Sequence, residues 1–177
     1  MTSFNKEHLR DQESKKAELQ LLHTNMQIHR HMTDVAIALN QAIINLGSIV
    51  SRQSIRPVHC ETAIKSIQFL LQLIHVSCRF LGNLPPFPEH SPIGRYRLLV
   101  LLYKIADEAD SLLTQIKQFR FKCRDISDEA VAQKQSIFLS INSFIKTCED
   151  INAYVVSFTK DDFNSIEKHI TASNLLM

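Results

Sequence analysis

The stretch IHRHMTDVAIALNQAIINLGSI, residues 28 to 49, decides the fold of this chain. Its apolar residues recur at alternating intervals of four and three, which places them on one side of a helix. A half-buried strand would instead alternate at every second position. The stretch therefore predicts a long helix with one buried seam, formed by Ile28, Met32, Val35, Leu39, Ala42, Leu46 and Ile49.

Three further segments carry the same spacing. Their seams are Cys60, Ile64, Ile67, Leu71, Ile74, Cys78 and Leu81; Leu98, Leu102, Ile105, Ala109, Leu112, Ile116, Phe119, Cys123 and Ile126; and Ile137, Ile141, Phe144, Cys148, Ile151, Val155 and Phe158. Neighbouring apolar residues widen each seam beyond that of a two-stranded coiled coil. We therefore predict an all-α fold, an up-down-up-down four-helix bundle of long helices with a short C-terminal fifth helix after Lys160.

Proline, glycine and capping residues mark the ends of these helices. Pro57 suits the first turn of the second helix, and Gly82 suits a left-handed cap at its end. The proline-rich segment NLPPFPEHSPIG, residues 83 to 94, predicts a stiff connection. The third helix is expected to end near Asp125, and Ser127 to cap the fourth.

The length of 177 residues suits one folded domain. The first helix is expected to extend over ~70 Å, against ~40 Å for the others, so its N-terminal part overhangs them. We assign residues 1–20 to a helical extension that either frays or is covered by a partner, and residues 21–177 to a single bundle domain.

The charges nearly cancel, with 20 Lys and Arg against 18 Asp and Glu. Such a balance provides no overall field to attract DNA. The longest uncharged stretch, Val35 to Ser51, contains three Asn and Gln residues and falls short of the ~20 apolar residues of a membrane span. No apolar core of a signal peptide is found at the N-terminus, so we expect a soluble, cytoplasmic protein with four reduced cysteines.

Motifs for metal, cofactor or phosphate binding are not found. The four cysteines show no C-x2-C pair, and no E-x-x-H, G-x-x-x-x-G-K-[ST] or G-x-G-x-x-G motif occurs. His75 precedes Cys78 by three positions, but His75 falls on a polar stripe and Cys78 on the apolar seam. We therefore expect no metal site and no cofactor.

Basic residues gather in the segment KQFRFKCR, residues 117 to 124. Lys117, Arg120, Lys122 and Arg124 alternate with phenylalanines, a pattern that could bind RNA or acidic lipid by charge and stacking. The alternative is that these cations interact with the C-terminal dipole of the third helix while Phe119 packs in the core.

Arg52 and His59 lie six residues apart across the first turn. This spacing loosely resembles that of the HEPN-type helical ribonucleases. The resemblance implies a histidine acting as acid or base and an arginine holding phosphate. It covers only these two residues and gives an alternative enzymatic function.

An apolar edge on the overhanging first helix, formed by Leu9, Leu19, Leu22 and Met26, favours another function. An edge beyond the reach of the shorter helices would be covered by a partner helix or a second copy of the chain. We therefore expect a non-enzymatic protein interaction module, such as an adaptor, regulator or effector domain, and rank membrane or RNA binding below a protein partner.

Overall fold

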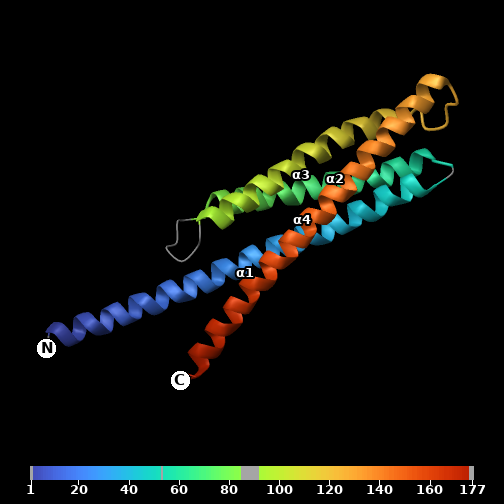
Figure 1. Ribbon diagram of the computed structural model, residues 1–177. Coiled ribbons are helices and arrows are strands. Elements are labelled where there is room, and N and C mark those ends of the chain that lie inside the picture. Colours follow the sequence, from blue (N-terminus) through green and yellow to red (C-terminus); the bar gives the residue numbers. More distant parts are fainter. Residues whose placement is uncertain (1, 53, 85–91, 176–177) are drawn as a thin grey trace.

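The computed structural model of the chain consists of four helices. It describes the backbone of residues 2–52, 54–84 and 92–175, and the side chains of residues 5–20, 22–52, 54–84, 96–150 and 152–153. The helices are α1 (Thr2–Ser51), α2 (Pro57–Gly82), α3 (Pro92–Phe119) and α4 (Asp128–Leu175), drawn in Figure 1. The backbone described contains no strand, and the expected all-α fold is confirmed.

The helices lie lengthwise against one another. Each helix contacts the next one along the chain, and α1 also contacts α4, which closes the ring. The turn from α1 to α2 and the turn from α3 to α4 lie at the same end of the bundle (Figure 1). Two contacts fix the level of α1 against α2, since His31 stacks on Phe80 at 4.5 Å and Asn45 donates a hydrogen bond to Ser66.

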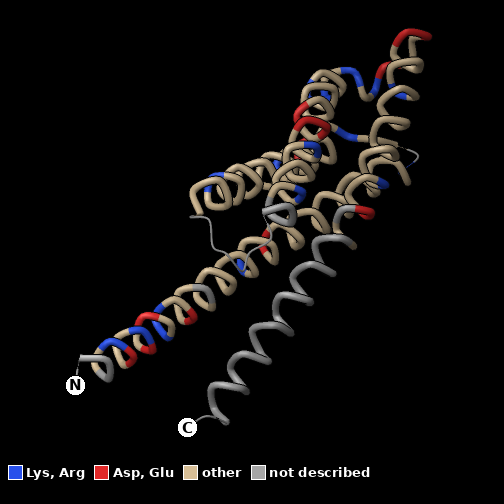
Figure 2. The backbone as a smooth tube through the Cα atoms, turned by 60° about the vertical axis from the view of Figure 1, so that its left-hand side comes forward, with Lys and Arg blue, Asp and Glu red and all other residues tan. Residues whose placement is uncertain are grey.

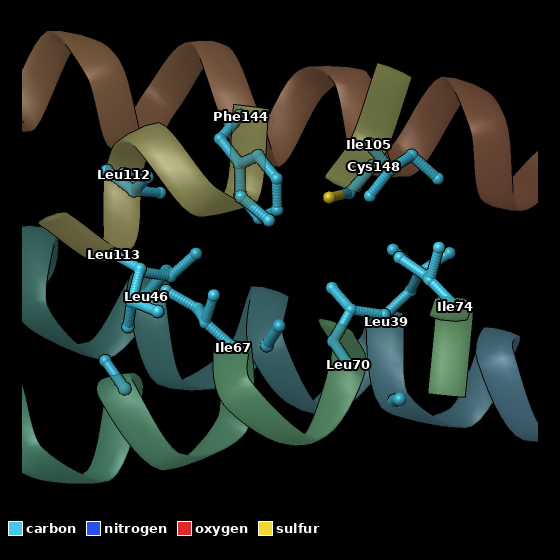
Figure 3. Close-up of a cluster of buried hydrophobic side chains, with 14 of the residues drawn as sticks. Leu39, Leu46, Ile67, Leu70, Ile74, Ile105, Leu112, Leu113, Phe144 and Cys148 are labelled. Atoms are coloured by element: carbon cyan, nitrogen blue, oxygen red, sulfur yellow. The ribbon is translucent and has the colours of Figure 1, made fainter. Parts of the chain in front are cut away.

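Most residues of the predicted seams form one core between the helices (Figure 3). Ile126 does not belong to it, since it is 93% exposed in the turn after α3, and Leu71 and Cys123 are only half-buried against it. Ile151, Val155 and Phe158 lie outside the described side chains. Eight seam residues that we expect to be deeply buried are each at most 2% exposed. They are Leu39, Leu46, Ile67, Ile74, Leu102, Leu112, Ile141 and Phe144. Removal of their apolar surface from water is the main stabilising contribution to such a bundle. The four-and-three spacing therefore identifies the buried face correctly.

Two of the expected helix starts are confirmed. Pro57 is the first residue of α2, where its missing N–H group is not needed. The Ser127 hydroxyl accepts a hydrogen bond from the backbone N–H of Ala130 at 3.2 Å. Asp128 and Glu129 follow in the first turn of α4, where negative charge interacts favourably with the helix dipole.

Three expected helix ends differ in the structure. Gly82 ends α2 without a left-handed backbone, because the N–H of Asn83 reaches the carbonyl of Arg79 at 3.1 Å instead. Helix α3 ends at Phe119 rather than near Asp125, because the chain must reverse there before α4 begins. The segment after Lys160 is helical but continues α4, since neither Gly nor Pro interrupts it and aspartate costs a helix under ~1 kcal/mol.

Candidate functional site

The N-terminal part of α1 extends away from the core with its side chains in solvent. Every residue from 5 to 20 is exposed. Of the predicted edge, Leu9, Leu19 and Met26 are 57%, 65% and 55% exposed, and Leu22 is half-buried. At about 100° per residue, Leu19 and Met26 share one side of α1, whereas Leu9 lies roughly 80–100° around the helix from them. The edge therefore centres on Leu19 and Met26.

This edge continues along the outer face of α1 beyond the residues predicted from sequence. Ile37 and Ile44 are 62% and 63% exposed. Successive intervals of 7, 11 and 7 residues connect Leu19, Met26, Ile37 and Ile44, and each interval brings the helix back to within about 20° of the same direction. We call these four residues the outer stripe. It extends over ~37 Å on the side of α1 opposite the core seam.

Helix α2 presents a similar row beside the outer stripe. Val58, Phe69 and Val76 are exposed and are spaced by 11 and 7 residues. Because His31 stacks on Phe80 and Asn45 bonds to Ser66, Phe69 lies close to the level of Ile44, and Val76 close to that of Ile37. The outer surface of the α1 and α2 pair is therefore rich in apolar side chains.

The C-terminal part of α1, which contains the uncharged stretch from Val35 to Ser51, is apolar in excess of what the core uses. A window of 18 residues in this helix has a mean hydropathy of 1.3, high enough by length and composition for a membrane span. Only 33% of that window is buried. The apolar residues of α1 are thus divided between the core seam and the outer stripe, and a monomer leaves the second set in water.

The turn between α1 and α2 brings together Arg52, Arg56 and His59. The backbone N–H of Arg56 donates to Nδ1 of His59 at 3.1 Å, and Nε of Arg52 donates to the Ser48 hydroxyl at 3.2 Å. Partial burial, followed by the charges of Arg52 and Arg56, lowers the pKa of His59. Neutral His59 thus uses its only ring acceptor within the turn, an arrangement that disfavours a general base.

The basic segment lies mainly in the turn after α3, at the same end of the bundle. Lys117 is on the last turn of α3, whereas Lys122 and Arg124 are exposed in the turn itself. The Arg120 guanidinium lies 4.6 Å from the ring centroid of Phe121, which is 77% exposed. Phe119 is buried in the core as expected. Both candidate cationic groups thus gather at one end, which sequence spacing did not indicate.

Histidines and cysteines do not form a metal site in the part of the chain described. His75 is exposed and Cys78 is buried, so the two side chains lie in different surroundings. The described side chains contain no group of three His, Cys, Asp or Glu residues close enough to hold a metal ion. Cys60, Cys78, Cys123 and Cys148 carry free thiols.

Two open hollows of about 500 and 560 Å³ lie between α3 and α4. One is lined by residues that include Tyr96, Val100 and Asp150, and the other by residues that include Asp107 and Leu139. Neither lining combines a nucleophile with a histidine or lysine base held in hydrogen-bond contact.

Comparison with family models, curated proteins and solved structures finds no match to this chain.

Proposed function

We propose that this protein is a non-enzymatic helical interaction module that binds a partner protein along the outer face of α1. The observation that carries the proposal is the outer stripe, whose four large apolar side chains are each more than half exposed on a single side of one helix. Burying such side chains stabilises a complex by about 1.5–3 kcal/mol each before the costs of association.

The N-terminal half of α1 needs such a partner more than the rest of the bundle does. An isolated helix is marginally stable in water and persists when one of its faces is packed. Residues 5 to 20 pack on nothing that the structure describes, yet they continue the core helix without a break. A helix laid against Leu19 and Met26 would supply the missing contact.

A second copy of this chain fits the surface by its charge. Residues 5 to 20 contain four basic residues (Lys6, Arg10, Lys15, Lys16) and four acidic ones (Glu7, Asp11, Glu13, Glu18), so they are neutral overall. Figure 2 shows the two signs mixed along this part of α1. The sequence from Val35 to Ser51 carries no charge. Two copies would therefore bring no net repulsion to a two-fold contact.

Sedimentation equilibrium of the full chain over a range of concentrations tests this proposal. The first variant combines Leu19→Glu with Met26→Glu, and the second combines Ile37→Glu with Ile44→Glu. The matched control is Leu139→Glu on α4, a residue that is 73% exposed and lies off the stripe. We expect both stripe variants to weaken self-association at least tenfold, or ~1.4 kcal/mol, while helicity and the melting temperature stay within a few degrees.

Three results would count against the second copy. The wild-type chain could sediment as a monomer at every concentration, the stripe variants could associate as tightly as wild type, or Leu139→Glu could weaken association equally. A fourth result would replace the protein partner with a bilayer, namely binding of wild type to neutral phosphatidylcholine vesicles that the Ile37 and Ile44 variant loses.

A further inference from the structure

Two of the four cysteines meet where the two turns of the bundle come together. Cys60 lies in the first turn of α2 and is fully buried, whereas Cys123 lies in the turn after α3 and is partly exposed. Cys123 is among the groups that raise the pKa of Cys60, which places the two side chains near each other although 63 positions separate them in the sequence. Both sulfur atoms also pack against the same core.

The backbone around Cys123 is a turn rather than a helix. Helix α3 ends at Phe119, and the N–H of Lys122 bonds to the carbonyl of Phe119 at 2.9 Å in a tight turn. The Cys123 thiol donates to the carbonyl of Arg120 at 3.4 Å. Rotation of the Cys123 side chain is therefore opposed by one weak hydrogen bond and no helical ladder. A rotation of the Cys123 side chain that breaks this bond frees its sulfur to approach that of Cys60, to the ~2.05 Å of a disulfide.

The two thiols differ in their exposure to solvent, and this difference sets the order in which they react. Burial raises the pKa of Cys60 to about 11, with a further contribution from Cys123, so Cys60 is a poor first nucleophile. Cys123 is the thiol that solvent reaches. An oxidant in solution therefore meets Cys123 first and leaves Cys60 to react second.

From this geometry we infer that Cys60 and Cys123 form a reversible disulfide when the protein meets a hydroperoxide. The Cys123 thiol gives up its proton, its sulfur attacks hydrogen peroxide, and the O–O bond breaks. The leaving hydroxide takes up that proton as water, and Cys123 becomes a sulfenic acid. The sulfur of Cys60 then attacks the sulfur of Cys123, its proton leaves with the hydroxyl group as a second water, and the S–S bond forms. The two thiols together lose two electrons, and the peroxide gains them.

The disulfide would join the first turn of α2 to the turn before α4. The loop it closes contains more than sixty residues, which constrains the unfolded chain strongly. It would also tie the two cationic turns of the bundle to each other, because Arg56 caps the start of α2 four residues before Cys60 and Arg120 lies three residues before Cys123. Cys78 and Cys148 are also buried, on other helical turns of α2 and α4.

The test treats the full-length protein with hydrogen peroxide, blocks the remaining thiols with an alkylating reagent and maps the peptides by mass spectrometry without reduction. We expect one intramolecular cross-link between the peptides of Cys60 and Cys123. The melting temperature should rise by at least about 5 °C and return to its first value with a reducing agent. Cys60→Ser and Cys123→Ser should abolish both effects, whereas the control Cys78→Ser should keep them.

Peptide mapping of the wild-type chain decides the question even if a serine variant folds poorly. Recovery of Cys123 as sulfinic acid without the cross-link would overturn the inference, as would a cross-link that joins two chains. An equal rise in melting temperature in Cys60→Ser would overturn it too, because the stabilisation would then come from another modification.

Discussion

Replacing Ile141 by alanine measures how strongly the seam of α4 stabilises the bundle. Ile141 is fully buried, while Leu139, two residues earlier on the same helix, is 73% exposed. Ile141→Ala removes three carbon atoms from the core. At about 0.8 kcal/mol per buried methylene these are worth ~2.4 kcal/mol, and the cavity left behind adds to the loss. We expect a total near 3–4 kcal/mol.

Urea unfolding followed by circular dichroism provides the measurement. Ile141→Ala should lower the midpoint without changing the slope, since the surface exposed on unfolding stays nearly the same. The melting temperature should fall by roughly 6–16 °C for a chain of this length. Leu139→Ala is the matched control and should cost under about 0.5 kcal/mol. Equal losses at the two positions would refute the assignment of the buried face.

Two predictions follow from the shifted pKa values. Burial raises the pKa of Cys148 to about 12 from a usual value of 9.0, so native Cys148 should resist a thiol reagent at pH 8. The stability that this thiol contributes should be complete below pH 9 and should decline as the pH rises towards 12. Unfolding at alkaline pH in wild type and Cys148→Ala checks the sign, since the variant should lose less stability over that range. The pKa of His59 is lowered from 6.5, so its contribution should be present above pH 6.5 and decline as the pH falls below it. An NMR titration should show a higher pKa of His59 in Arg52→Gln, and an unchanged value would contradict the role of that charge.

The seams were predictable because helix periodicity is a local property of the sequence. The spacing from Leu39 to Leu46 and from Ile141 to Phe144 repeats at the helix period, and these residues are buried as expected. Proline at 57 and serine at 127 act within one turn of a helix, so their effects also follow from neighbouring residues.

The candidate surface was predictable only in part. Leu19 and Met26 were identified because the first helix is longer than its neighbours. Ile37 and Ile44 lie among core residues in the sequence, and only their 7-residue spacing, in register with Leu19 and Met26, distinguishes them. That signal was present in the sequence, but the stronger core seam of the same helix obscured it.

The sequence by itself determined that the chain forms long helices, which side of each helix is buried, and where two of the helices start. These features depend on residues within a few turns of one another. Only the tertiary structure decided that α3 ends at Phe119, that Cys123 lies near Cys60, and that the turn after α1 and the turn after α3 lie at the same end of the bundle. Such placements depend on the position of each helix along the bundle axis relative to the others. That position is set by contacts between residues far apart in the chain.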